Sequence, residues 1–419
     1  MTTHTSALRP GIEERLNVME ASAAALKSHG LIHRVAEDAR LDGRRISVDG
    51  RALVNFGSCS YLGLETDARL KTAACEALLR FGTQFSSSRA YVSLPLYAEF
   101  EALLSELVGG YPVVVSQTTS LGHLAALPVL VGANDAVLFD VQVHSSLQAV
   151  LPTLRMAGVP CEAVPHNRLD RLEERARALA ERHARVFYLC DGVYSMHGDA
   201  VDVNGLCGVL DRIPNLHAYV DDAHGVGWSG ARGSGHVLGA GPLHPRMMVI
   251  LGLSKSFGAA GAALVFPTRE LAERVFTCGS TLIFSGPLQP AQLGAGVASA
   301  RIHLSPELEQ LQAGLRQRIQ CFDACATEQK LRTRSQIQTP IRFVEVGSEE
   351  VAMNWGGALK RAGFFTNVAV YPAVPRRRAG IRLMLNLNQT LDDVRGVVHE
   401  LGRLTSKASS TIQAAPALT

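Results

Sequence analysis

Lys255 follows a short apolar run at 247–251 and comes directly after Ser254. The run predicts a buried strand that delivers the lysine to the edge of a sheet. A second apolar segment ends at Asp221, and His224 follows it within the same turn. A lysine amine can form a Schiff base with an aldehyde, and a carboxylate can keep a pyridine nitrogen protonated. These residue types at successive strand ends therefore point to chemistry with an aldehyde cofactor.

Lys255 or Asp221 alone would not indicate a cofactor site, because a single lysine after a strand is more often a solvated cap. Pyridoxal 5'-phosphate (PLP) needs both, since Lys255 would hold its aldehyde and Asp221 would make its ring an electron sink. The combination therefore predicts a PLP site.

Elements that could position these residues follow from the hydrophobic pattern. Short apolar runs alternate with helical segments, which predicts an α/β fold with a mostly parallel sheet and helices on both faces. The expected strands are 113–115, 136–140, 161–164, 186–189, 218–220, 248–251 and 262–266. Such sheets bind ligands at the carboxyl ends of their strands. The residues expected there are Asp191, Asp221, His224 and Lys255.

Domain boundaries are expected near residues 60 and 290, the second marked by Pro287 and Pro290. Helical patterning over 12–41 predicts an N-terminal arm, and an Asp-Gly pair within 45–54 predicts a hairpin. A long helix is expected over 291–330. The predicted division is an arm and hairpin at 1–60, a large domain at 61–290, a small α/β domain at 291–405 and a disordered tail at 406–419.

Composition narrows the class of protein. With 419 residues, 47% hydrophobic and 19% charged, the chain is long enough for two domains, and a net charge of +3 gives no case for nucleic-acid binding. No segment is long and apolar enough to predict a membrane span, and no signal-like core opens the chain. Eight scattered cysteines predict reduced thiols in a cytoplasmic protein, and no metal site is expected.

Several segments carry a resemblance to one family. The segment 140–146 is similar to a D-x-x-x-H-A-S motif, 191–199 to an x-S-V-F-S-M-D-G-D loop, and 59–64 to N-D-Y-L-G-L. Together with the aspartate and lysine motifs, in the same order over about residues 50–390, they resemble the α-oxoamine synthases. This family of fold-type-I PLP enzymes implies a large domain with a mostly parallel seven-stranded sheet and a smaller C-terminal α/β domain.

The resemblance implies a role for each matched residue. Lys255 would hold the cofactor, His144 would stack on its ring, Asp221 would pair with the ring nitrogen, and His224 and Ser195 would contact the phenolic oxygen. These residues would form the catalytic and cofactor-binding set. The phosphate would be held by hydroxyls around a helix N-terminus, namely Thr118, Thr119, Ser120, Ser254 and Ser285.

Substrate binding is expected at Arg382, which matches an arginine that grips an amino-acid carboxylate through its bidentate fork. Cys59, which stands where the family has an asparagine, is also expected to bind substrate, as is Arg89, which lies in a segment that replaces a glycine-rich turn. His123 also stands at an asparagine position. The changes at Cys59 and in the segment around Arg89 predict a specialised member that makes a secondary metabolite or signal molecule.

The activity that the resemblance implies is decarboxylative condensation of an amino acid with an acyl thioester. The products are an α-aminoketone, CO₂ and a free thiol. The acyl carrier would be coenzyme A or an acyl carrier protein, and a homodimer is expected. An aminotransferase, lyase or aldolase on the same fold remains the alternative, because these enzymes share the lysine and the aspartate.

Overall fold

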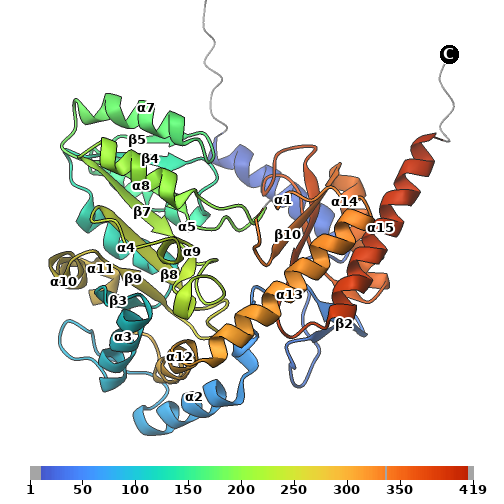
Figure 1. The fold of residues 1–419 in the computed structure, drawn as a ribbon, viewed down its shortest axis with the longest axis horizontal. Coiled ribbons are helices and arrows are strands. Elements are labelled where there is room, and N and C mark those ends of the chain that lie inside the picture. The colour runs from blue at the N-terminus through green and yellow to red at the C-terminus, as the bar shows by residue number, and fades with distance from the viewer. Residues whose placement is uncertain (1–10, 336, 414–419) are drawn as a thin grey trace, which may run out of the picture.

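A seven-stranded sheet forms the centre of the larger part of the molecule (Figure 1). The structure is a computed structural model, and it describes residues 11–335 and 337–413. Its strand order is β3-β9-β8-β7-β6-β4-β5. The strands are β3 (Val113–Ser116), β4 (Ala136–Asp140), β5 (Cys161–Val164), β6 (Val186–Asp191), β7 (Leu216–Asp221), β8 (Met247–Gly252) and β9 (Ala262–Val265). All seven predicted strands are confirmed, most of them one to three residues longer than expected.

Strand direction explains where the chemistry collects. Only β9 runs antiparallel to its neighbours in this sheet, so the carboxyl ends of the other strands meet at one edge. The register places Asp191 opposite Asp221, and Asp221 opposite Ile250. Lys255 follows β8 at the same edge. The predicted gathering of acidic and basic residues at this edge is therefore confirmed.

Helices cover both faces of the sheet because its strand residues alternate between two apolar clusters. One face packs against α3 (Pro95–Leu107), α7 (Leu169–Ala180), α8 (Val203–Arg212) and α12 (Pro290–His303). The opposite face packs against α4 (Thr119–Leu130), α6 (Leu151–Met156) and α10 (Arg269–Cys278). The shorter or peripheral helices are α2 (Ala68–Phe81), α5 (Ser145–Gln148), α9 (Gly235–Gly239) and α11 (Ser280–Ile283).

The predicted hairpin is formed by β1 (Arg45–Val48) and β2 (Arg51–Asn55), and β2 also pairs with β11 (Phe364–Phe365). A second small sheet has the order β10-β13-β12. Its strands are β10 (Ile341–Gly347), β12 (Asn367–Ala369) and β13 (Ala379–Met384). These sheets share a core with α13 (Glu307–Glu328), α14 (Glu349–Arg361) and α15 (Leu391–Gln413), drawn in orange and red in Figure 1.

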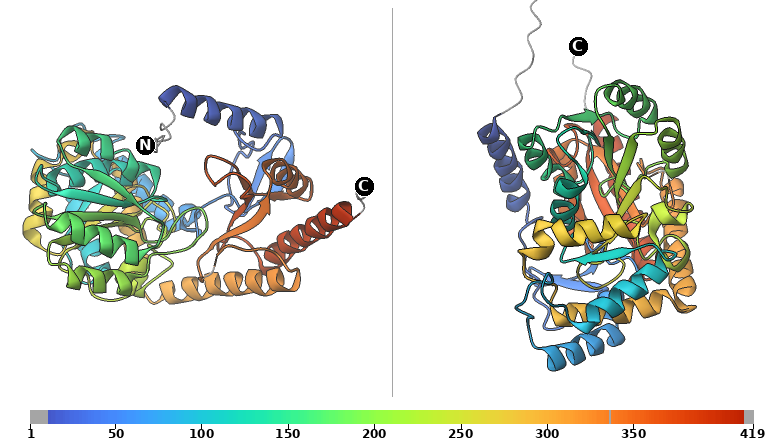
Figure 2. Two further views of the ribbon diagram at one scale, coloured as in Figure 1. Left: turned by 90° about the horizontal axis from the view of Figure 1, so that it is seen from above. Right: turned by 90° about the vertical axis from the view of Figure 1, so that its left-hand side faces the viewer.

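The N-terminal helix is shorter than its apolar pattern predicted. Helix α1 (Ile12–Ser28) ends at a left-handed Gly30, whose N–H bonds the Lys27 carbonyl while the Leu31 N–H bonds that of Leu26. This pairing is a Schellman cap, which stops a helix. The prediction of a helical arm over 12–41 is therefore confirmed for residues 12–28 and wrong for the residues after them. Figure 2 shows α1 in dark blue along the outside of the molecule.

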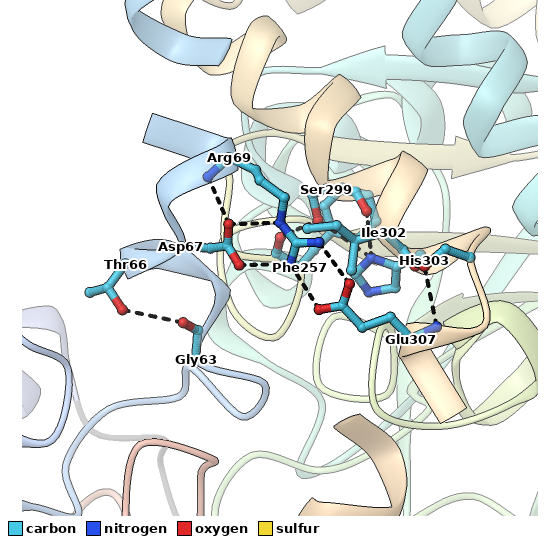
Figure 3. Close-up of polar contacts among 10 residues, drawn as sticks. Gly63, Thr66, Asp67, Arg69, Phe257, Ser299, Ile302, His303 and Glu307 are labelled. Atoms are coloured by element: carbon cyan, nitrogen blue, oxygen red, sulfur yellow. Dashed lines mark hydrogen bonds and ion pairs between the residues drawn. The ribbon is translucent and has the colours of Figure 1, made fainter. Parts of the chain in front are cut away.

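The long helix expected over 291–330 is also wrong, because the chain breaks between α12 and α13. Pro306 cannot donate a helical hydrogen bond and disfavours helix at Ser305 before it. The new helix starts with Glu307, whose carboxylate accepts two hydrogen bonds, at 2.7 and 2.8 Å, from the Arg69 guanidinium of α2 (Figure 3). The break thus turns the chain from the large sheet towards the smaller ones.

At the C-terminal end, α15 continues to Gln413, so disorder does not begin at residue 406 as expected. Residues 414–419 lie outside the described residues. The division into the predicted domains stays a prediction. Within the described ranges, no helix combines the length and apolar character needed to cross a membrane.

Candidate active site

Asp221 is the last residue of β7, and both oxygens of its buried carboxylate are hydrogen-bonded. Its Oδ2 lies 3.0 Å from His123 Nε2, and its Oδ1 accepts the Ala223 N–H at 3.0 Å. Burial alone would raise the pKa of Asp221, but the hydrogen bond and charge of His123, with the charge of Lys255, hold it below its ordinary value. Asp221 is therefore a stable buried anion.

Asp191 lies directly across the sheet from Asp221 and behaves in the opposite way. Burial and the charge of Asp221 raise the pKa of Asp191 well above its ordinary value, and its Oδ1 accepts the His144 N–H at 3.1 Å. Two neighbouring carboxyl groups are thus split into one charged and one neutral form. The negative charge of this edge is concentrated on Asp221.

His224 is buried and held by Tyr61, whose hydroxyl lies 2.8 Å from His224 Nδ1. Burial and the charges of Lys255 and Arg382 lower the pKa of His224 well below its ordinary value, so the ring is neutral. Burial also raises the pKa of Tyr61 well above its ordinary value, so Tyr61 keeps its proton. If Tyr61 donates to Nδ1, Nε2 carries the ring hydrogen and can donate to a ligand oxygen.

His144 lies at the start of α5, and its Nδ1 is 2.7 Å from the Ser146 hydroxyl. Burial lowers the pKa of His144, the charge of Asp221 opposes that effect, and the charge of Lys255 adds to it. These charges act on His144 because its ring lies near both residues. The structure therefore brings His144 together with Lys255, Asp221 and His224.

The N-terminus of α4 forms the other end of the site. Thr118 caps it by accepting the Leu121 N–H at 3.1 Å, which leaves its own O–H free to donate. Gln117 Nε2 donates to the Ser285 hydroxyl at 3.1 Å, which places Ser285 beside this helix start. Thr119 and Ser120 form the first turn, where backbone N–H groups lack partners within the helix. This hydroxyl-rich helix start can hold a phosphate.

Ser254 belongs to the same edge through β8 and precedes Lys255. Helix α4 also lies very close to the sheet at Gly122. A Cβ there would come within 2.6 Å of Ile250 Cδ1 and 2.9 Å of Ser116 Oγ. Only glycine allows the helix start to approach the strand ends this closely.

Arg382 comes from β13 and meets residues from distant parts of the chain. Its Nε donates to the Ser195 carbonyl oxygen at 2.7 Å, and its Nη2 lies 3.9 Å from Cys59 Sγ. The charge of Arg382 lowers the pKa of His224. The structure therefore places Arg382, Cys59 and Ser195 at the Tyr61–His224 side of the site.

Arg89 does not join this group. Its guanidinium bonds the Val115 carbonyl at 3.0 Å and pairs with Glu101 at 3.0 Å. It also stacks 3.8 Å above the Tyr97 ring. The side chain is 7% exposed, so Arg89 supports the packing of α3 against β3 instead of contacting the residues around Lys255.

Three residues that complete the site had no predicted role: Tyr61, His123 and Tyr219. Tyr61 lies in a recognised motif, but its partner is 163 positions away in the chain. Tyr219 could have been placed, because it lies two residues before Asp221 and so shares its face of β7.

The combined donor set fits PLP. The buried anion Asp221 suits a protonated pyridine nitrogen, and the neutral His224 and the Ser195 hydroxyl suit a phenolic oxygen. The helix start at Thr118 suits a phosphate. Lys255 supplies the amine, and its charge lowers the pKa of Asp221.

Comparisons with known proteins agree with this arrangement. Residues 51–347 match the model of the family "aminotransferase class I and II". An 8-amino-7-oxononanoate synthase from Maricaulis maris is 31% identical over 396 residues, which cover 94% of this chain and 95% of the relative. A second one, from Herminiimonas arsenicoxydans, is 31% identical over 387 residues, covering 88% of this chain and 95% of that protein.

Solved structures show the same fold. A serine palmitoyltransferase from Sphingomonas wittichii superposes with a TM-score of 0.85 at 22% identity, covering 96% of this chain and all of that one. An 8-amino-7-oxononanoate synthase from Francisella tularensis gives 0.71 at 21% identity, with 85% and 99% covered.

Proposed function

The chain belongs to the aminotransferase class I and II family and, within it, to the α-oxoamine synthases, and on that premise we propose how its residues carry out the reaction. Such enzymes use PLP to condense an amino acid with an acyl thioester, releasing CO₂ and a free thiol. The observation that carries the residue assignment is the ionised Asp221 beside the charge of Lys255 at one sheet edge.

Bound PLP supplies an electron sink for the bond that breaks at the amino-acid α-carbon. Lys255 would hold the cofactor and, once displaced by the amino acid, take the α-carbon proton on Nζ. Asp221 would keep the ring nitrogen protonated, and His144 would cover the ring. His224 and Ser195 would donate to the phenolic oxygen.

Arg382 would bind the amino-acid carboxylate, because its Nη2 lies 3.9 Å from Cys59 Sγ while its Nε is fixed to the Ser195 carbonyl. Cys59 offers less hydrogen bonding than an amide would. We propose on this basis that the amino acid is not glycine with a short acyl partner, and that the enzyme serves a specialised aminoketone pathway. The acyl carrier would be coenzyme A or an acyl carrier protein.

The enzyme is proposed to act as a cytoplasmic homodimer. Tyr91 is 89% and Phe284 is 86% exposed, and the two segments that carry them are joined by the Ser88 hydroxyl, which donates to the Ile283 carbonyl at 2.7 Å. Large exposed apolar side chains grouped on one surface are typical of an interface. A second copy of this chain would cover them.

A product screen tests the reaction. Purified enzyme with PLP would be incubated with a panel of amino acids and acyl thioesters, and products identified by mass spectrometry. We expect CO₂ and free thiol in equal amounts, without any keto-acid acceptor, and no product from Lys255→Ala. If the amino group were transferred readily to pyruvate or 2-oxoglutarate and no thioester released thiol, the proposal would be refuted and the enzyme would be an aminotransferase.

A further inference from the structure

His123 lies on α4, fully buried, with both ring nitrogens in hydrogen bonds. Nε2 is 3.0 Å from Asp221 Oδ2, and Nδ1 is 3.1 Å from the Tyr219 hydroxyl. Tyr219 and Asp221 lie two residues apart on β7 and face the same helix. Helix and strand therefore present a continuous chain of three polar side chains inside an otherwise apolar layer.

Proton positions along this chain follow from the partners. An ionised carboxylate can only accept, so His123 Nε2 carries a hydrogen and donates it to Asp221. Burial raises the pKa of Tyr219 well above its ordinary value, so its hydroxyl retains a proton that it can donate to Nδ1. In this arrangement both ring nitrogens of His123 have a hydrogen-bond partner.

We propose that His123 is a positioning residue for PLP: it orients the Asp221 carboxylate and keeps it charged for the ring nitrogen, while Tyr219 fixes the imidazole. The inference rests on the PLP site of the proposed function. A buried ring nitrogen without a hydrogen-bond partner is costly, so a residue that only fills space here would be apolar. The two hydrogen bonds on opposite sides of one ring define its orientation.

Two amide substitutions separate positioning from packing. In a glutamine, the amide nitrogen reaches about as far as histidine Nε2, so His123→Gln can still donate to Asp221. In the shorter asparagine, the amide reaches only the position of Nδ1, so His123→Asn can bond Tyr219 but loses Asp221. A role in packing alone would not distinguish them in this way.

The experiment measures PLP binding to the apoproteins by equilibrium dialysis, together with the ¹⁵N NMR shift of the ring nitrogen in labelled PLP. For His123→Asn we expect PLP affinity about ten- to a hundredfold lower, the range for losing a hydrogen bond to a charged group. The ring nitrogen should also lose its proton at a lower pH. His123→Gln should remain within a few-fold of wild type, and Tyr219→Phe should lie between the two.

His303→Asn is the matched control, because His303 is equally buried but bonds the Ser299 carbonyl at 2.9 Å and stacks on Phe257, away from Asp221 (Figure 3). It should lower the melting temperature of the apoprotein without moving the ¹⁵N signal. Equal PLP affinity and equal ¹⁵N titration in His123→Asn, His123→Gln and wild type would overturn the inference. Failure of wild type itself to bind PLP would instead overturn the proposed function.

Discussion

At the scale of single residues, the site works by giving chemically similar side chains different protonation states. Asp221 is ionised because His123 and Lys255 support its charge, whereas burial and Asp221 itself keep Asp191 protonated. A third carboxyl group, Asp222, is also buried, and burial raises its pKa to about 8. Only one of three neighbouring carboxyl groups can therefore stabilise a positive ring nitrogen at neutral pH.

At saturating PLP, replacing Asp221 by asparagine should reduce turnover by about 10²-fold or more, because a neutral amide cannot hold the ring nitrogen protonated. Thiol release, followed with a thiol-reactive dye, measures the loss. Asp222→Asn is the control, since that carboxyl is already neutral and its Oδ2 accepts the Val237 N–H at 2.9 Å. Near-normal turnover of Asp221→Asn would refute its assignment.

Tyr61→Phe should lower kcat about tenfold, because the tautomer of His224 is no longer fixed and its buried Nδ1 loses a partner. Both kcat and melting temperature would be measured. Tyr97→Phe serves for comparison, since it removes a similarly buried hydroxyl that accepts the Leu288 N–H at 2.7 Å. Both variants should melt earlier, but only Tyr61→Phe should turn over slowly. Equal kcat in the two variants would contradict a role for Tyr61.

Much of the candidate site could be predicted, because Asp221 ends one strand and His224 and Lys255 follow strands whose carboxyl ends must meet. Tyr61 and His123 could not be assigned, since their roles depend on tertiary contacts and not on local pattern. Arg89 was expected to bind substrate, but its guanidinium pairs with Glu101 and lies over two aromatic rings, contacts that local pattern does not show either.

At the scale of elements, His166 joins the two loops that carry His144 and Ser195. Its Nδ1 lies 2.9 Å from Asp140 at the end of β4, and its Nε2 lies 2.6 Å from Asp199 in the Ser195 loop. Burial lowers the pKa of His166, but the hydrogen bonds to both carboxylates outweigh it and raise the pKa to about 9. A cation between two anions thus holds the loops together.

This clamp should make stability depend on pH. Because folding raises the pKa of His166 from 6.5 to about 9, its contribution is complete below pH 6.5 and is lost as the pH rises through 9. The contribution is about 3 kcal/mol. Urea unfolding of wild type and His166→Gln between pH 6 and 10 measures it. The difference in unfolding free energy should shrink towards pH 10, and a constant difference would rule out the clamp.

Strands were easier to predict than helix ends. Each strand of the large sheet is a short apolar run, so tertiary packing and local pattern agree. Helix α1 and the α12–α13 break depend on Gly30 and Pro306, which stop helices although apolar periodicity continues past them. At both places the backbone preference of one residue outweighs the apolar periodicity around it.

At the scale of the whole molecule, the exposed Tyr91 and Phe284 predict that two copies associate. Phe284→Glu should convert dimer to monomer and weaken PLP binding, because a charge would be buried in the interface. Sedimentation velocity and PLP titration check both effects. Met156→Glu is a matched control, since Met156 is 89% exposed but lies on α6. A Phe284→Glu protein that remains dimeric would exclude this surface as the interface.

Contacts between the two ends of the chain, such as the pairing of β2 with β11, have a consequence for the order in which the protein folds during synthesis. Cys59 and Arg382 meet although they are 323 positions apart. On a ribosome, the seven strands of the large sheet emerge long before β11 and β13 do. The side of the site that holds Cys59 and Arg382 must therefore close last, after β13 has left the exit tunnel, and chains cut before β13 would carry Asp221 and Lys255 without Arg382.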